Sequence, residues 1–172
     1  MDQEITASYV WTADELIKAQ ENHARAQCRR GYRIGLKFVL LMMILAGWCS
    51  YQARGWSVLT VLFPLVGVYL LFLRKYDVRW SLRRHFKKRP DRDSRIVWTL
   101  GESDLQTRTD ESQSRRNWSQ ITKVRRAPNG FLLYANDSMF HWLPTSAFAC
   151  EEDRQRAEEL LQSKIKDFAD IR

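Results

Sequence analysis

Few side chains in this sequence have the types and spacing that catalysis or metal binding requires. His23, His85 and His141 lie far apart in the chain, and none has a carboxylate or cysteine at the spacing of metal ligands. Ser119 and Ser146 belong to no nucleophile-elbow motif, and the sequence has no glycine-rich phosphate loop. We therefore expect no enzymatic activity, no metal and no cofactor.

Three consecutive acids, Glu151, Glu152 and Asp153, could be taken for paired catalytic carboxylates. They open the stretch from Glu151 to Ile171, whose apolar residues recur with helical spacing. Carboxylates in the first turn stabilise a helix through its dipole. We interpret the three acids as the start of an amphipathic C-terminal helix.

The basic residues are concentrated in one part of the sequence. Half of the 28 Lys and Arg residues lie within residues 25–89, and the rest of the chain has a small excess of acids. Arg79, Arg83 and Lys87 recur every four residues, with Lys88 beside them, so on a helix they would share a face suited to anionic lipid headgroups. A nucleic-acid surface would spread its cations over the folded domain. The pattern predicts membrane lipids as partners and no nucleic acid.

Two apolar runs within residues 34–73 explain where these cations lie. The runs, 34–53 and 56–73, have 20 and 18 residues, close to the roughly 20 helical residues that a bilayer core requires. Only Arg54 and Gly55 separate them, so the helices would be antiparallel neighbours. Both outer flanks are basic, whereas the turn has one cation. The positive-inside rule then predicts a multi-pass transmembrane hairpin with both termini cytoplasmic.

Small residues indicate where the two helices of the hairpin would touch. Ala46 and Gly47 lie in the middle of the first run, and Gly67 lies in the second. Small side chains let two helix backbones approach closely. We expect these residues to form the contact.

The remaining residues divide into three regions. Residues 1–33 are expected to form an N-terminal cytoplasmic strand and a helix capped by Thr12. Residues 74–90 read as a basic juxtamembrane helix that Pro90 ends. Residues 91–172 contain short strands with turns about every eight to twelve residues, which predicts an antiparallel meander followed by the C-terminal helix.

The C-terminal region has a recognisable order of motifs. A strand with the pattern Trp-Ser-x-Ile precedes a turn, a hydrophobic strand and a Leu-Pro-Thr-Ser-Ala-Phe stretch: Trp118, Ser119 and Ile121, then Phe131–Tyr134, Phe140 and Leu143–Phe148. Together with the two apolar runs, this order resembles the YcxB-like family of bacterial two-span membrane proteins. That family typically has a basic residue where this chain has Thr145. The resemblance implies a bacterial cell inner-membrane address and a cytoplasmic domain similar to pleckstrin-homology folds.

These patterns predict an α+β protein: a transmembrane helical hairpin plus a small antiparallel β domain similar to pleckstrin-homology folds, closed by a C-terminal helix. The leading hypothesis is a noncatalytic integral inner-membrane protein whose cytoplasmic β domain binds an unknown protein partner or self-associates as a homo-oligomer. Trp118, Trp142 and Phe148 are the candidates for partner contact, although buried aromatic residues are more often core. An alternative is an immunity or defence protein that protects the membrane against a toxin. Transport would need more intramembrane polar groups than the second run offers.

Overall fold

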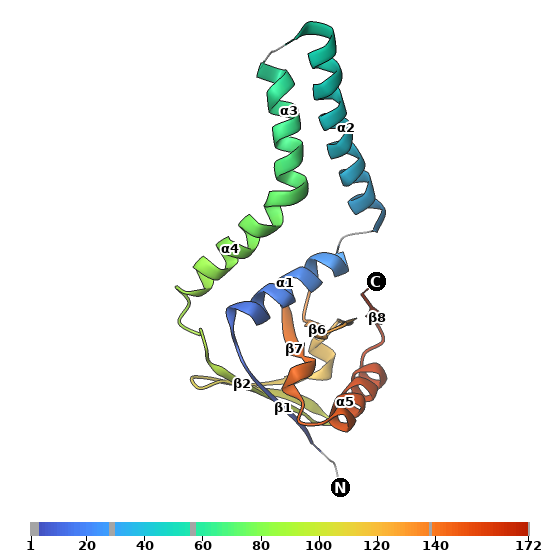
Figure 1. Cartoon of the computed structure of the whole chain (residues 1–172). Coiled ribbons are helices and arrows are strands. Elements are labelled where there is room, and N and C mark those ends of the chain that lie inside the picture. The colour runs from blue at the N-terminus through green and yellow to red at the C-terminus, as the bar shows by residue number, and fades with distance from the viewer. Residues whose placement is uncertain (1–3, 28–29, 56–57, 138, 172) are drawn as a thin grey trace. The chain divides into compact units, whose positions relative to one another are not determined.

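The computed structural model divides into two compact units (Figure 1). The first unit combines Met1–Ala26 with Phe86–Arg172, and the second is Gln27–His85. The N-terminal strand and helix therefore belong to the same unit as the C-terminal domain, whereas the sequence pattern predicts residues 1–33 as a region of their own. The residues described are 4–27, 30–55, 58–137 and 139–171.

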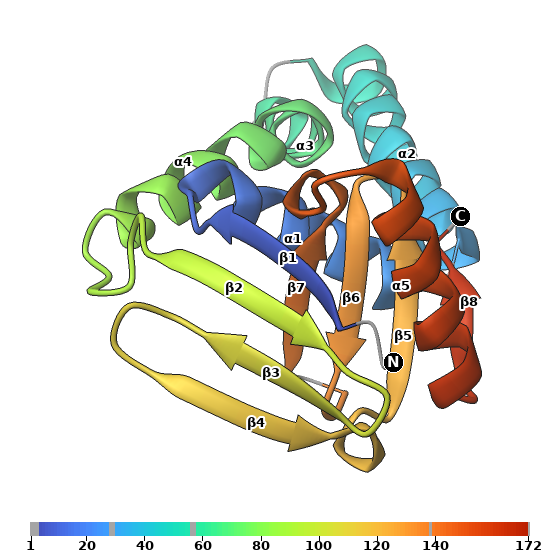
Figure 2. The same cartoon turned by 90° about the horizontal axis from the view of Figure 1, so that it is seen from below.

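Four antiparallel strands form the first sheet, in the order β1-β2-β3-β4 (Figure 2). They are β1 (Ile5–Val10), β2 (Arg95–Leu100), β3 (Asp104–Arg108) and β4 (Gln113–Asn117). β1 pairs with β2 along its whole length, from Ile5 opposite Leu100 to Val10 opposite Arg95. Ile5 and Ala7 are buried and Thr6 between them is exposed, so the predicted N-terminal strand is confirmed.

The second sheet has the order β7-β6-β5-β8. Its strands are β5 (Lys123–Ala127), β6 (Gly130–Tyr134), β7 (Phe140–Pro144) and β8 (Phe168–Asp170). β8 runs parallel to β5 and is held there by ion pairs from Arg125 to Asp167 and from Arg126 to Asp170. The predicted C-terminal helix is therefore too long. α5 (Glu151–Lys164) ends before these pairs, and the chain then becomes a strand.

The hydrophobic core lies between the two sheets and α5. Trp98 and Leu100 of the first sheet pack with Phe131 and Leu143 of the second, and Leu161 of α5 joins them. The other face of the second sheet is covered by α1 (Ala13–Gln27), so all five residues of β6 are buried. β6 is buried on both faces because the first sheet and α5 cover one face and α1 covers the other.

α1 is attached to the second sheet by polar contacts as well. The Thr12 hydroxyl accepts from the Glu15 N–H at 3.3 Å, which confirms the predicted N-cap. The Glu15 carboxylate accepts from Trp142 Nε1 at 2.7 Å. His23 Nδ1 lies 2.9 Å from the Tyr134 hydroxyl. These bonds link α1 to β6 and β7.

The second unit is a helical hairpin followed by a polar helix. α2 (Arg30–Arg54) and α3 (Val58–Val68) are followed by a π-helical turn (Tyr69–Leu73) and by α4 (Arg74–Phe86), whose last residue belongs to the first unit. Gly55, at the end of α2, has a φ of 72°, a conformation that glycine adopts without strain.

The predicted transmembrane hairpin is wrong. None of the helices in the described ranges is long and apolar enough to cross a membrane. The second apolar run does not form one helix: α3 has 11 residues and contains Pro64, and the π-helical turn and the polar α4 follow it. α2 has 25 residues but includes Lys37 and has arginine at both ends. The α+β class stands, with two sheets in place of one meander.

The predicted helix contact is confirmed for two of its three small residues. A Cβ built on Gly47 would lie 2.4 Å from Cγ of Pro64, and one built on Gly67 would lie 2.8 Å from Cγ1 of Ile44. Both glycines are buried, whereas Ala46 is exposed. α2 and α3 therefore touch through Gly47 and Gly67.

Candidate functional site

A groove of about 730 Å³ opens in the first unit, between the ends of the two sheets. Strands β1, β2 and β3 supply one wall, and β7 supplies the other. Its interior is aromatic: Tyr9, Trp11, Trp98, Phe140 and Trp142. Sites for small ligands and peptides have this size and this apolar character. All its lining residues belong to the first unit.

The rim of the groove is charged, with more acids than bases. Six ionisable residues line it: Arg89, Asp91, Arg92, Asp93, Asp110 and Glu111. Arg89 donates to both carboxylate oxygens of Asp91, at 2.8 and 2.7 Å, which pairs one cation with one anion. The other four are three acids and one arginine, so the rim has a net negative charge.

Backbone hydrogen bonds hold both sides of the rim in place. The Trp11 N–H donates to the Ser94 carbonyl at 2.9 Å, and the Asp93 N–H donates to the Trp11 carbonyl at 3.0 Å. On the opposite side, Thr109 and Ser112 close the β3–β4 turn through N–H to carbonyl and N–H to hydroxyl bonds of 2.7 and 3.1 Å. Asp110 and Glu111 therefore sit on a fixed turn.

Trp98 places a polar group inside the groove wall. Its side chain is 2% exposed, and within the described part of the chain its indole Nε1 has no hydrogen-bond acceptor. Burial raises the pKa of the Tyr9 hydroxyl, and the neighbouring Trp98 indole offsets part of that rise. The Tyr9 hydroxyl donates to the Trp142 carbonyl at 2.7 Å. Buried N–H groups rarely lack a partner.

His141 supplies a second donor beside Trp98. The two rings are 5.8 Å apart and meet edge to face. Nε2 of His141 is hydrogen-bonded to the Arg116 guanidinium, which can only donate, so Nε2 accepts and the hydrogen is on Nδ1. Burial, followed by the positive charge of Arg116, lowers the pKa of His141 from 6.5 to about 4. The imidazole is therefore neutral at physiological pH.

This neutral histidine predicts an acid-sensitive fold. Between about pH 6.5 and pH 4 the unfolded chain would hold a proton on His141 and the folded chain would not, so stability falls as the pH is lowered through this window. We expect urea unfolding of wild type and His141→Gln to differ in their loss of stability between about pH 7 and pH 5. The difference should be on the order of 1 kcal/mol, allowing for the ring's partial exposure. Identical pH profiles would contradict the assignment.

The three residues named for partner contact lie in different surroundings. Trp118 is 7% exposed, and its Nε1 donates to the Gly101 carbonyl at 3.0 Å within the core. Phe148 packs against the same core and bridges to Ala7. Trp142 lies on the groove. Partner contact by these residues stays a prediction, and Trp142 is the one that the groove includes.

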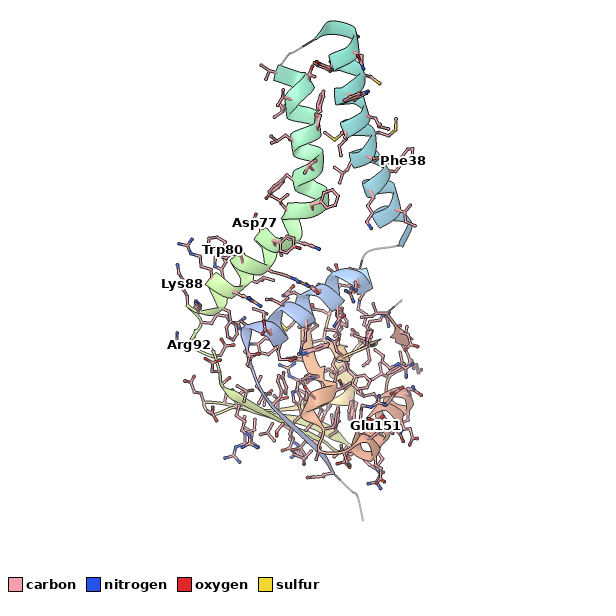
Figure 3. All side chains as sticks on the ribbon, in the orientation of Figure 1. Phe38, Asp77, Trp80, Lys88, Arg92 and Glu151 are labelled. Atoms are coloured by element: carbon pink, nitrogen blue, oxygen red, sulfur yellow. The ribbon has the colours of Figure 1, made fainter. Side chains whose placement is uncertain are left out.

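The four cations named for lipid contact do not share one helix face. Arg79 and Arg83 are exposed on α4, where Trp80 also projects (Figure 3). α4 ends at Phe86, so Lys87 and Lys88 lie in the turn that follows it. The four-residue spacing therefore applies only to the two arginines. Arg84 lies 5.4 Å from the Trp80 ring, a cation–π distance.

The other chemical candidates have structural partners. Glu151 is paired with Arg154, as its place in the first turn of α5 allows. Across the residues described, no group of three or more His, Cys, Asp or Glu side chains could hold a metal ion. His141 belongs to the groove, and His23 stacks on Phe140 at 4.4 Å.

The residues of the groove do not form a recognisable pattern in the sequence. Tyr9, Trp98 and His141 are far apart in the chain. Two local features are visible in the sequence: Tyr9 and Trp11 alternate around the end of β1, and residues 89–94 are rich in charge. That these two segments lie side by side follows only from the pairing of β1 with β2.

Comparison with known proteins finds a family likeness in the C-terminal part of the chain. Residues 100–161 match the family model described as YcxB-like protein. This stretch contains β3 to β7 and most of α5. It is similar to a YcxB-like domain over these residues. The matched residues do not include α2 and α3, so the match gives no support to the two-span description.

No curated protein and no solved structure was found to match the chain. The likeness to pleckstrin-homology folds therefore remains an implication of the family resemblance.

Proposed function

We propose that this protein is a noncatalytic binding module whose β domain receives a protein partner in the groove between its two sheets. The observation that carries the proposal is the groove of about 730 Å³, whose lining is aromatic and includes the neutral His141. Aromatic walls with a few placed polar groups are typical of recognition sites.

The polar groups of the groove favour binding over catalysis. His141 is bonded to Arg116, and Asp91 is paired with Arg89. Asp110 accepts from the Arg95 N–H at 3.2 Å. A general base must be free to reach the proton that it removes. These side chains instead keep the walls and the rim in place.

Blocking the groove tests the proposal. Thr107 lies opposite Trp98 on β3 and lines the groove, so Thr107→Trp should fill it. Peptides selected from a random display library on the full-length protein should lose binding to Thr107→Trp by at least about tenfold. They should keep binding to Gln113→Trp, a control on β4 outside the groove. Equal binding to all three proteins would contradict the proposal.

We also propose that the protein acts at a membrane, through contact with lipid. Large apolar side chains of α2 and α3 are exposed; Phe38, for example, is 62% exposed and faces away from α3 (Figure 3). Contiguous exposed apolar surface of this kind is typical of membrane or protein contact. The cations of residues 74–92 add attraction to anionic headgroups.

Neutralising the four named cations should weaken the preference for anionic lipid. Changing Arg79, Arg83, Lys87 and Lys88 to Gln should lower the ratio of full-chain binding to phosphatidylglycerol-containing over pure phosphatidylcholine vesicles by about tenfold or more at low salt. The matched control removes the same charge elsewhere: Arg108, Arg115, Lys164 and Lys166 changed to Gln. A similar loss in both variants, measured by vesicle flotation, would show that position does not matter and would contradict the prediction.

A further inference from the structure

We infer that the second unit binds one anionic phospholipid, with an acyl chain in a groove between α2 and α3 and the phosphate at the end of that groove where Lys37 and Arg74 lie. This assignment rests on the proposed membrane contact and names the lipid that would make it.

The hairpin groove, between α2 and α3, is long and apolar. Its volume is about 940 Å³, and it lies wholly within the second unit. Ile44 of α2 faces Val61 and Leu65 of α3 across it, and no charged residue lines it in the described part of the chain. On the α3 side the lining runs from Thr60 to Leu73, roughly 20 Å of helix. A groove of this shape suits a hydrocarbon chain.

The side chains of the hairpin groove are exposed in the free protein. Val61 is 47% exposed, Leu65 62% and Tyr69 41%. Covering apolar surface is favourable in proportion to the area removed from water, and each methylene of an occupant adds to it. A long alkyl chain therefore gains more here than a compact ligand does.

The antiparallel helices bring two cations to the same end of the hairpin groove. A Cβ built on Gly67 of α3 would lie 3.2 Å from the Leu40 carbonyl oxygen of α2. Lys37 is one helical turn before Leu40, and α2 also contacts the π-helical turn that ends at Leu73. Arg74 follows Leu73 directly. Lys37 and Arg74 therefore lie at the end of the groove that Leu73 lines.

This end has a net positive charge. Lys37, Arg74 and Lys75 give three positive charges, and Asp77 gives one negative charge. Asp77 accepts from the Tyr69 hydroxyl at 2.9 Å. This hydrogen bond raises the pKa of Tyr69, and the positive charge of Arg74 offsets part of the rise, so Arg74 is close to a residue that lines the groove. Neither Lys37 nor Arg74 forms a salt bridge with any residue that the structure describes.

The charge favours a lipid over a second copy of the hairpin. Residues 22–76 contain no Asp or Glu, so the hairpin of another copy would bring apolar side chains but no carboxylate for Lys37 and Arg74. An anionic phospholipid brings both an alkyl chain and a phosphate, and Lys or Arg near such headgroups is stabilising. It therefore matches the groove and its basic end together.

Native mass spectrometry of the full-length protein in a neutral detergent measures the binding of single lipids. The probes are dioleoyl phosphatidylglycerol and dioleoyl phosphatidylcholine, which have the same chains and differ in headgroup charge. The first phosphatidylglycerol should bind at least about tenfold more tightly than phosphatidylcholine. Changing Lys37 and Arg74 together to Gln should lower this ratio by about tenfold and leave the affinity for phosphatidylcholine unchanged.

Val61 and Leu62 provide a matched pair for the acyl chain. They are neighbours on α3 and are 47% and 46% exposed, but of the two only Val61 lines the hairpin groove. Val61→Trp should fill the groove and weaken binding of both lipids by at least about tenfold. Leu62→Trp should leave both affinities within about twofold of wild type. Circular dichroism checks that both variants keep their helices. If Val61→Trp does not fold, the Lys37 and Arg74 variant decides, because it leaves the groove walls unchanged.

The outcomes separate this site from the proposed membrane contact. Vesicle binding that depends on the four cations named above, combined with wild-type retention of phosphatidylglycerol by Val61→Trp, would keep the membrane contact and overturn the hairpin groove as the site. Equal affinity for the two lipids, or retention of neither, would overturn the anionic lipid. Dimers that Val61→Trp abolishes, with no lipid retained, would assign the groove to a second copy instead. Vesicle binding that ignores the four cations, with lipid retained in the groove, would contradict only the wider contact.

Discussion

Replacing Gly130 by alanine is expected to destabilise the β domain by about 3 kcal/mol or more. A Cβ at this position would lie 2.6 Å from the Leu143 carbonyl oxygen and 2.6 Å from the Trp142 ring. Gly130 starts β6 and pairs with Pro144 of β7, so the oxygen belongs to the neighbouring strand. Neither group can move freely, because Leu143 and Trp142 are both buried. Domains of this size are stable by only about 5–15 kcal/mol, so much of the folded state's margin would be lost.

Urea unfolding followed by tryptophan fluorescence measures the effect. Gly101→Ala is the control in the same domain, because a Cβ there would approach the Asp104 carbonyl and carboxylate oxygens only to 3.3 Å. We expect it to change stability by less than about 1 kcal/mol. If Gly130→Ala unfolds at the wild-type urea concentration, β6 and β7 are not as close as the structure has them.

Replacing Gly47 by alanine is expected to separate α2 from α3. The new Cβ would lie 2.4 and 2.5 Å from Cγ and Cδ of Pro64 and 3.2 Å from the Thr60 carbonyl oxygen. The proline ring cannot rotate away, so the helices must move apart and the contact at Gly67 loosens as well. We expect a loss of about 1–3 kcal/mol, the range for overpacking a close contact. Thermal unfolding of the full chain in a mild detergent, followed by circular dichroism, measures it.

A second substitution makes the cause testable. Changing Pro64 to alanine in the same chain removes the two ring carbons nearest the new Cβ, and the double variant should recover much of the lost stability. Gly35→Ala is the control, because a Cβ built there meets no atom within 4 Å among the described residues beyond its own stretch of helix. It should be neutral or stabilising by up to about 1 kcal/mol, since alanine favours a helix. A double variant no more stable than Gly47→Ala would show that Pro64 is not the obstacle.

Local patterns were predictable where short-range physics decides them. Thr12 caps α1 because its hydroxyl reaches an N–H three residues away. Alternation from Ile5 predicts a half-buried strand, and small residues predict the contact at Gly47 and Gly67. Each depends on residues within one element or on two adjacent helices. Length was less predictable. The C-terminal helix ends at Lys164 because pairing of β8 with β5 competes with further helix.

The hairpin and the groove show what composition leaves undecided. The hydropathy of a segment does not show where its α-helix ends. The 18-residue apolar run predicts one long helix, whereas the structure has an 11-residue α-helix that ends at Val68 and a π-helical turn after it. In the groove, Tyr9, Trp98 and His141 come from three strands in two sheets. Nothing in their spacing brings them together.

By itself the sequence determined the α+β class, the turns, the helix cap and the concentration of cations in residues 25–89, because these follow from local propensity and charge. The tertiary structure alone decided that β1 joins the C-terminal domain, that Trp98 is buried without an acceptor, and that acids rim an aromatic groove. The physical reason is that strand pairing and burial are non-local. Which residues face one another depends on the free energy of the whole packed core. A short stretch of sequence does not include all the residues that determine this free energy.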